Sequence, residues 1–317
     1  MKCLVTGPTG FIGRALCEAL TAAEHDVTGL LRLADPAPGA IPHLSHDLRE
    51  PLPDTLSLRG FDAVFHVAGV AHRRAPAACH LAVNERASIA LAQRAARDGV
   101  RRFVFLSSVK AMGYAGVPVP RAETQGVAPI GGYAVSKRRA EIALMQLAGE
   151  SALEMVVLRP ALVYGAGVGG NLAALVSWVR RGLPLVPEVG ARSMVSRDDL
   201  VRLLVALADK TVHGLPPDGA LWNVTDDEAY STRRLMLALS SAMRRPVSRL
   251  VMPVTGWRLL GACADLQRRA PLGTTASALL DYELYDSRAV GVATGWQPRQ
   301  CFEDVAPAIV RAAAVAR

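Results

Sequence analysis

The chain contains 317 residues, of which 51% are hydrophobic and 20% are charged, a balance that is typical of a folded globular protein and excludes a disordered one. No run of about 18 apolar residues occurs, and the chain enters a predicted strand at once, so we expect neither a membrane span nor a signal peptide and assign the protein to the cytoplasm. The net charge of +8 comes mainly from scattered arginines rather than from a basic run, so we expect no nucleic-acid partner.

The cysteines carry no recognisable pattern. There are five of them, at positions 3, 17, 79, 263 and 301, and none is spaced as C-x-x-C. An odd, unpatterned set indicates reduced thiols rather than a disulfide framework, and no group of histidines and cysteines has metal-ligand spacing. We therefore expect no bound metal.

Short apolar runs alternate with helical patterns along the first half of the chain. They predict strands at 2–6, 27–31, 63–67, 102–107 and 155–158, and helices at 11–22 and about 80–98. Such a succession needs right-handed crossovers and produces a parallel sheet with helices on both faces. We predict an α/β fold with a doubly wound parallel sheet.

The alternation loosens after about residue 165. Helical patterns remain at 171–181, 198–209 and 231–243, with one further strand at 221–224. Ligands of doubly wound sheets lie beyond the carboxyl ends of the strands, where these less regular segments would cover them. We predict a dinucleotide-binding domain at 1–165, to which 192–224 returns, and a smaller C-terminal substrate-binding lobe made of 166–191 and 225–317.

A glycine-rich turn joins the first strand to the first helix. Gly7, Gly10 and Gly13 lie within Val5-Thr6-Gly7-Pro8-Thr9-Gly10-Phe11-Ile12-Gly13. Glycines let the backbone approach an anion closely, and the N-terminus of the following helix points its amide groups at that anion. The turn therefore predicts a pyrophosphate site and a Rossmann-type domain.

Tyr133 and Lys137 lie one helical turn apart, so their side chains share one face of a helix. There the lysine charge would lower the pKa of the phenol. Ser108 follows the fourth strand, 25 residues before the tyrosine. With the glycine turn, these three residues indicate a redox site, and we predict Ser108, Tyr133 and Lys137 as its catalytic residues.

These motifs resemble those of the extended short-chain dehydrogenase/reductases that act on nucleotide sugars, and the resemblance covers essentially the whole chain. It is carried by Thr6 with the three glycines, Asp47-Leu48, His66-Val67-Ala68-Gly69, Asn84, Ser107-Ser108, Tyr133 with Lys137, Leu158-Arg159-Pro160, Val163-Tyr164-Gly165, and Arg192 through Asp199-Leu200. In this family the tyrosine exchanges a proton with the substrate, the lysine holds the nicotinamide ribose, and the serine hydroxyl bonds the substrate carbonyl.

The resemblance also implies a set of cofactor contacts. They are Gly7, Gly10, Phe11, Ile12, Gly13, Asp47, Leu48, Val67, Ala68, Gly69, Ser107, Tyr133, Lys137 and Pro160. Asp47 is expected at the adenine edge, and His66 is expected to be structural. Asn84 would orient either a helix or an active-site water.

The end of the second strand bears on cofactor preference. Relatives that prefer NAD carry an acidic residue there, whereas this chain has Leu31 and then Arg32. A guanidinium suits a 2′-phosphate, and the missing carboxylate removes a repulsion against it. We therefore favour NADP(H), with Arg32 as a cofactor ligand; if Arg32 only stacks on adenine, NAD(H) remains the alternative.

For the substrate, the resemblance assigns phosphate contacts to Asn171 and Arg192, since a pyrophosphate needs an amide donor and a cation. Lys110 replaces the alanine or threonine usual at its position in the family, and it is a candidate for shaping the sugar pocket together with His72 and Arg73. The expected partner is a nucleotide sugar, namely a UDP-sugar.

Two activities fit the resemblance. The first is an NADPH-dependent 4-ketoreductase acting on a UDP-4-keto-6-deoxy-N-acetylhexosamine for surface polysaccharide, and the second is a UDP-hexose or UDP-N-acetylhexosamine 4-epimerase with tightly held NAD. Dehydratases of the family carry Asp-Glu where this chain has Val109-Lys110, which argues against dehydration. The alternative from another functional class is a non-catalytic sensor or scaffold that binds NADP(H).

The resemblance also predicts a homodimer. In relatives, the helix that corresponds to 80–98 and the helix that contains Tyr133 pair with their copies across a two-fold axis and form a four-helix bundle.

Overall fold

The computed structural model describes residues 1–317 except 33–40, 72–74, 209–214, 249, 269–272 and 316–317. A seven-stranded sheet fills the larger part of the molecule, in the order β3-β2-β1-β4-β5-β6-β9, and every neighbouring pair in it is parallel. Its strands are β1 (Lys2–Thr6), β2 (Asp26–Leu31), β3 (His43–Ser45), β4 (Ala63–His66), β5 (Arg102–Leu106), β6 (Glu154–Pro160) and β9 (Ala220–Val224).

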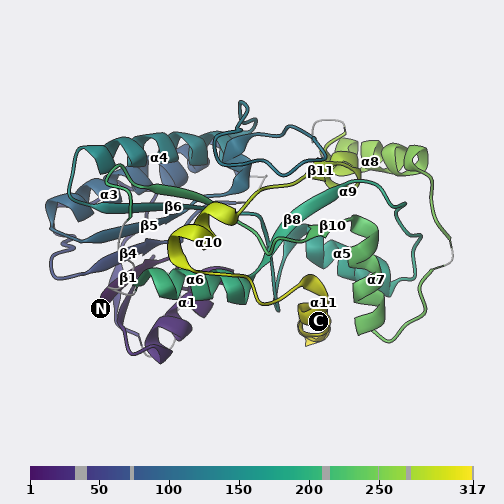
Figure 1. The fold of residues 1–317 in the computed structure, drawn as a ribbon, viewed down its shortest axis with the longest axis horizontal. Helices are drawn as coiled ribbons and strands as arrows, with labels where there is room; N and C mark the ends of the chain where they lie inside the picture. The colour runs from purple at the N-terminus through teal and green to yellow at the C-terminus, as the bar shows by residue number, and fades with distance from the viewer. Residues whose placement is uncertain (33–40, 72–74, 209–214, 249, 269–272, 316–317) are drawn as a thin grey trace.

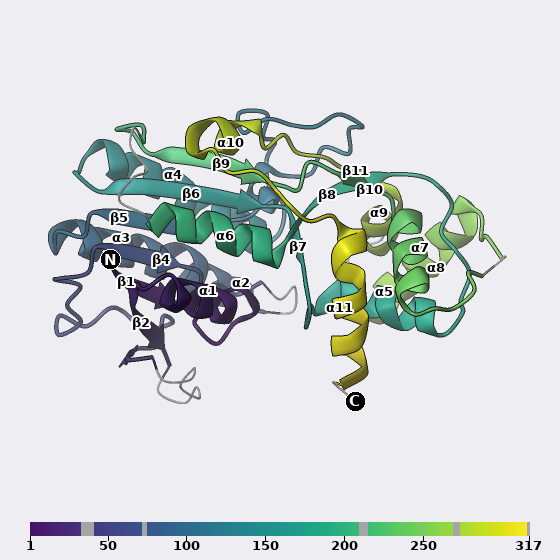
Figure 2. The ribbon, with the colours of Figure 1, turned by 60° about the horizontal axis from the view of Figure 1, so that its bottom comes forward.

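Helices cover both faces of this sheet (Figure 1). One face carries α1 (Phe11–Ala22) and α6 (Arg197–Ala208), which pack against each other, and Figure 2 shows them side by side. The other carries α3 (Ser88–Arg97) and α4 (Gly132–Gly149). Buried leucines and alanines from each helix pair meet the strands in two separate cores, so both faces of the sheet are removed from water. The predicted doubly wound fold is confirmed.

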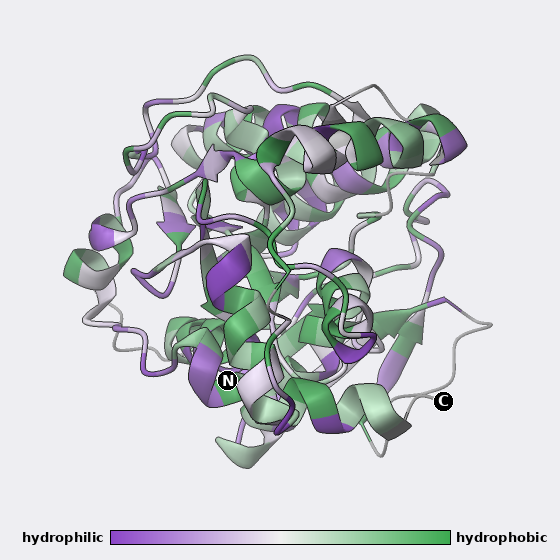
Figure 3. Ribbon diagram, turned by 90° about the vertical axis from the view of Figure 1, so that its right-hand side faces the viewer, coloured by the Kyte–Doolittle hydropathy of each residue, from purple (hydrophilic) through white to green (hydrophobic). Residues whose placement is uncertain are grey.

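The smaller lobe combines short strands with five helices in its described part. Its strands β7 (Leu162–Tyr164), β10 (Ala229–Tyr230) and β11 (Tyr282–Glu283) all pair with β8 (Ala191–Ser196). The helices are α5 (Gly170–Arg180), α7 (Thr232–Ala242), α8 (Val254–Arg268), α9 (Thr274–Leu280) and α11 (Phe302–Val315). Hydrophilic and hydrophobic segments alternate along the helices seen from this side in Figure 3, as amphipathic packing requires.

Four short helical segments are also part of the larger part of the molecule. α2 (Ala77–His80) runs into a π-helical segment, η1 (Leu81–Ala87), and then into α3, so the predicted helix at about 80–98 is present but underwound in its first part. The 3-10 turn η2 (Val109–Met112) follows β5, and α10 (Arg288–Thr294) packs near β9. Among the described residues, no helix is long and apolar enough to cross a membrane.

Candidate functional site

The glycine turn forms a backbone cradle at the carboxyl end of β1. Gly7 has a φ of +67°, and a Cβ placed on Gly13 would lie 2.0 Å from the Gly7 carbonyl oxygen, so neither position accepts a larger residue without a shift. Gly10 is the N-cap of α1 and supplies no side-chain cap. The first amides of α1, at Phe11 and Ile12, are thus available to an anionic ligand, and this cradle fits a pyrophosphate.

A neutral histidine links this turn to the neighbouring strand. The Ser88 hydroxyl donates to the Asn84 carbonyl (2.9 Å), so it accepts from His66 Nε2 (2.8 Å), and His66 Nδ1 in turn accepts from the Thr6 hydroxyl (2.8 Å). Burial lowers the pKa of His66 to about 3. Thr6 Oγ1 also accepts from the Ala68 amide at 3.0 Å. The structural role expected for His66 is therefore to fix the segment that contains Val67, Ala68 and Gly69.

The three predicted catalytic residues converge. Ser108 follows β5 and caps η2, whereas Tyr133 and Lys137 lie on the first turns of α4. The Ser108 side chain lies close enough to the Tyr133 phenol to lower its pKa. Lys137 is 3% exposed, donates from Nζ to the Leu106 carbonyl at 2.7 Å, and lies 4.4 Å from the centre of the Phe105 ring.

The electrostatics of these residues differ from the sequence expectation. Burial raises the pKa of Tyr133, while the hydrogen bond from Ser108 lowers it and the charge of Glu141 raises it further. Burial also lowers the pKa of Lys137 to about 7, against a raising effect of Glu141. The net shift of the Tyr133 pKa by the protein's own groups is upward, because desolvation outweighs the lowering effect of Ser108. The lowering expected from Lys137 together with the oxidised nicotinamide stays a prediction.

Asn84 is fully used by the protein. It lies in the π-helical turn η1, where its Oδ1 accepts from the Val70 amide at 2.8 Å and its Nδ2 donates to the Val70 carbonyl at 3.0 Å and to Ser136 Oγ at 3.2 Å. A Cβ on Gly69 would lie 3.2 Å from this Oδ1 and 3.3 Å from Lys137 Nζ. Asn84 thus fixes the loop that contains Gly69 and Val70 next to the Lys137 ammonium group.

The residues predicted to contact the adenosine follow β2 and β3. Arg32 is exposed directly after β2, and Leu48 is half-buried against the sheet. The Asp47 carboxylate accepts from Arg49 Nε at 3.0 Å, and this bond holds the pKa of Asp47 at about 2. Pro160 is the buried last residue of β6. The candidates His72 and Arg73 lie outside the described residues.

Ser107 is turned toward the protein interior. Its hydroxyl donates to Glu141 Oε1 at 2.5 Å, and Glu141 is in turn paired with Arg159. The side chain of Ser107 is therefore engaged, and a cofactor contact there would involve its backbone. The Glu141–Arg159 pair was not predicted from the sequence, although Glu141 follows Lys137 by one helical turn and Arg159 lies in Leu158-Arg159-Pro160.

The second sheet brings a cation to the same end of the molecule. Arg192 lies on β8, and its Nε is buried without a hydrogen-bond partner among the described residues. Burial lowers the pKa of Arg192, while the charges of Glu283 and Asp281 raise it. Lys110 of η2 donates to Glu283 and Tyr114 donates to Asp281. These two acids were missed, because a strand of two residues leaves no periodic signal.

Asn171 is exposed at the second residue of α5 and takes no part in the contacts around Arg192.

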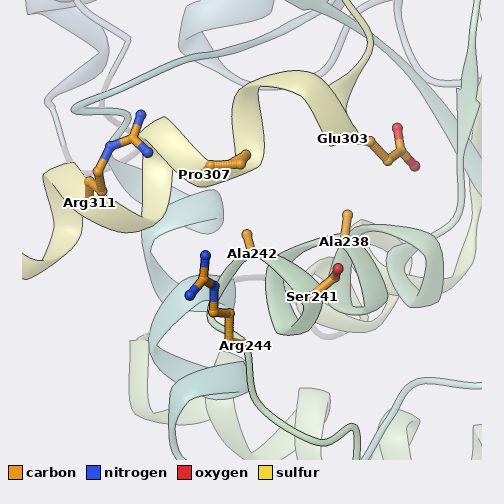
Figure 4. Close-up of a pocket in the computed structure, with 7 residues that line it drawn as sticks. All are labelled: Ala238, Ser241, Ala242, Arg244, Glu303, Pro307 and Arg311. Atoms are coloured by element: carbon orange, nitrogen blue, oxygen red, sulfur yellow. The ribbon is translucent and has the colours of Figure 1, made fainter.

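In the part of the chain that the structure describes, no group of histidine, cysteine or acidic residues could hold a metal ion. A hollow of about 430 Å³ lies between α7 and α11 and is lined by Arg244, Arg311 and smaller side chains, but it contains none of the predicted site residues (Figure 4).

Comparison with known proteins covers nearly the whole chain. A UDP-glucose 4-epimerase from Vibrio cholerae is 30% identical over 313 residues, which is 95% of this chain and 92% of the relative. A 2-alkyl-3-oxoalkanoate reductase from Stenotrophomonas maltophilia is 27% identical over 84% of this chain and 83% of its own length.

Solved structures agree in fold. MoeE5 in complex with UDP-glucuronic acid and NAD superposes with a TM-score of 0.78 at 22% identity, with 100% of both chains covered. The UDP-glucose 4-epimerase of Thermotoga maritima gives the same TM-score and identity, over 100% of this chain and 99% of that one. The model of the NAD dependent epimerase/dehydratase family matches residues 3–224, which carry the glycine turn and the Ser108, Tyr133 and Lys137 site. The chain is an enzyme of the NAD dependent epimerase/dehydratase family, a group within the extended short-chain dehydrogenase/reductases.

Proposed function

We propose that this enzyme is a nucleotide-sugar oxidoreductase, and that it acts as an NADPH-dependent 4-ketoreductase on a UDP-4-keto-6-deoxy-N-acetylhexosamine. The observation that carries the proposal is the convergence of Ser108, Tyr133 and Lys137 at the carboxyl end of the parallel sheet, with the glycine cradle at the same edge. This arrangement has the proton donor, the carbonyl partner and the cation that a carbonyl reduction requires.

The protein's own residues define the proton path. Ser108 donates a hydrogen bond to the substrate carbonyl oxygen, and Tyr133 gives its phenolic proton to the same oxygen as negative charge develops there. Glycines 7, 10 and 13 would hold the pyrophosphate of the dinucleotide, and Lys137 the nicotinamide ribose. When bound, the nicotinamide supplies the hydride.

The smaller lobe is the proposed site of the sugar nucleotide. Arg192 and Asn171 would bind its pyrophosphate, and the buried unpartnered Nε of Arg192 supports this assignment, because such a group is costly without a ligand. In this proposal, the large sheet and its helices, within 1–165 and 192–224, bind the dinucleotide, and 166–191 and 225–317, together with β7 and β8 of the small sheet, bind the substrate.

The choice of a reductase rests on Arg32. It follows β2, whose last residue, Leu31, offers no carboxylate to the adenosine ribose. A cationic guanidinium at this position favours NADPH, the reductant of the cellular pool, over NAD. The similarity to a reductase of Stenotrophomonas maltophilia is consistent with this choice.

A 4-epimerase is the second candidate, and the similarity to the Vibrio cholerae UDP-glucose 4-epimerase over the whole chain favours it. The same three residues would then act in both directions on the sugar hydroxyl and ketone. An epimerase regenerates its cofactor in each turnover, so it has no need of added NADPH.

One assay separates the two candidates. The purified protein is given UDP-4-keto-6-deoxy-N-acetylglucosamine with NADPH, or UDP-glucose and UDP-N-acetylglucosamine with nothing added, and products are separated by chromatography. A reductase consumes NADPH in proportion to the ketosugar reduced. Interconversion of gluco and galacto forms without added cofactor, together with no loss of NADPH on the ketosugar, would establish the epimerase instead. Failure in every arm would contradict both.

A further inference from the structure

A buried ion pair lies directly behind the catalytic residues. Glu141 and Arg159 have side chains that are each 1% exposed. Arg159 donates to the Glu141 carboxylate from Nε at 2.9 Å and from Nη2 at 2.7 Å. Ser107 donates to the same carboxylate at 2.5 Å, and Arg138 approaches it at 3.5 Å. Removing two charges from water is costly, and the attraction within a buried ion pair often only offsets that cost. We therefore looked for a role of this pair other than stabilisation of the fold.

The contacts of the pair reach the residue next to Ser108 and the segment that precedes Tyr133. Ser107 precedes Ser108, and its amide donates to the Leu158 carbonyl at 2.7 Å while its hydroxyl binds Glu141. Ser107 is therefore fixed through both its backbone and its side chain, which limits where the Ser108 hydroxyl can lie. Arg159 Nη1 also donates to the Glu123 carbonyl at 3.0 Å, in the segment that leads to Tyr133.

Glu141 also shares a helix face with the other two residues. It follows Lys137 by about one turn and Tyr133 by about two turns of α4. We propose that Glu141 is a positioning residue for this site, which holds Ser108 through Ser107 and places a buried carboxylate one helical turn from Lys137. The inference rests on the proposed function only for its activity readout.

The charges around Lys137 support the second part of this role. Tyr133 lies one turn before Lys137 on α4, and His66 is close enough to feel the lysine charge, but burial keeps His66 neutral by lowering its pKa to about 3. Burial lowers the pKa of Lys137 itself to about 7, and Glu141 is the group whose charge raises it. Loss of the Glu141 charge would leave Arg159 uncompensated and would disfavour the ammonium form further.

Lysine NMR tests this directly, because the chain has only four lysines, Lys2, Lys110, Lys137 and Lys210. The full-length protein is labelled with ε-¹³C-lysine, and the Lys137 signal is assigned by its loss in Lys137→Met. In Glu141→Gln, the Lys137 titration midpoint is expected to fall by about one pH unit relative to wild type. Glu150→Gln is the matched control, since Glu150 caps the same helix, is exposed and accepts only from Gln146 in the described structure.

The activity readout separates the two parts of the role. Glu141→Gln is expected to lower kcat at neutral pH by about tenfold or more, with the KM for the sugar nucleotide nearly unchanged. If Glu141→Gln does not fold, Ser107→Ala replaces it, because that change removes one hydrogen bond and no charge. Ser107→Ala is expected to lower kcat about tenfold with the Lys137 midpoint unchanged.

Two results would overturn the proposal. One is a folded Glu141→Gln variant in which Lys137 titrates as in wild type. The other is an unaltered kcat in Ser107→Ala. If no substrate is turned over by the wild type, the proposed function fails, while the Lys137 titration still tests the charge effect of Glu141.

Discussion

The Tyr164 phenol donates a 2.7 Å hydrogen bond to the buried carboxylate of Asp226, and Tyr230 donates to the same oxygen at 2.8 Å. Tyr164 ends β7, Tyr230 ends β10 and Asp226 follows β9, so this cluster joins the last strand of the large sheet to the small sheet. Burial raises the pKa of Asp226 to about 6 despite these hydrogen bonds, because desolvation outweighs them.

The raised pKa predicts a pH dependence of stability. A carboxyl whose folded pKa lies above its unfolded value stabilises the fold below about pH 4, and this contribution is lost as the pH rises through about 6. The loss should be on the order of 2 to 3 kcal/mol in the free energy of unfolding. Denaturant titrations from pH 4 to 7 measure it. Asp226→Asn should flatten this slope, whereas the exposed control Asp218→Asn should retain it; a slope shared by all three proteins would assign the effect elsewhere.

Tyr133→Phe tests the proton donor. The change removes only the phenolic hydroxyl, so kcat should fall by about 10²- to 10⁴-fold while NADPH affinity is retained. Steady-state kinetics and a fluorescence titration with NADPH give the two values. Tyr282→Phe on β11 removes a phenol from a partly exposed position and serves as the control. Undiminished turnover in Tyr133→Phe would remove the tyrosine from the mechanism.

Leu31→Asp combined with Arg32→Asn tests the cofactor preference. Charge-assisted bonds from Arg32 to a 2′-phosphate should contribute roughly 1.5–3 kcal/mol, equivalent to about a tenfold to hundredfold preference for NADPH. The double variant should prefer NADH, as measured by the two dissociation constants. Arg59→Asn, an exposed change elsewhere on the surface, should leave the ratio unaltered. Equal affinities in the wild type would show that Arg32 does not read the phosphate.

Arg192→Gln tests the substrate site. Loss of the guanidinium should weaken UDP binding by about tenfold to hundredfold, because a charged donor to phosphate is lost. Calorimetric titration with UDP measures this change. Arg288→Gln is the control, since the Arg288 side chain is 86% exposed and pairs with Asp286. A dissociation constant for UDP that does not change in Arg192→Gln would place the nucleotide elsewhere.

The proposed homodimer would form through α3 and α4, which pack together on one face of the sheet. Ile142 of α4 is 56% exposed there and would be covered by the partner. Light scattering should give twice the chain mass of 33.6 kDa, and Ile142→Glu should reduce it to one chain mass. Val292→Glu on α10, at an apolar residue 88% exposed, should leave the dimer intact. A monomeric wild type at micromolar concentration would contradict the proposal.

The sequence predicted features that follow local patterns. Apolar runs predicted β1, β2, β4, β5, β6 and β9 to within a few residues. The spacing of Tyr133 and Lys137 predicted that they share a helix face, and Ser108 was predicted to join them in the catalytic site. β3 was missed because its three residues, His43–Ser45, form no apolar run. Glu141 and Arg159 look like surface charges in sequence, and only the tertiary fold places them together in the interior. Burial in the folded protein also raises the pKa of Tyr133, and the spacing of residues in the sequence does not predict this burial.

The path of the chain between the two sheets has a consequence for dissection of the enzyme. After β6 the chain enters the small sheet with β7 and β8, returns with α6 and β9, and leaves again with β10. A fragment that stops at residue 165 would lack β9, so the backbone groups of β6 would form an open sheet edge, and it would lack α6, so apolar side chains of α1 would face water. Such a fragment should aggregate, and the intact enzyme should unfold in a single transition.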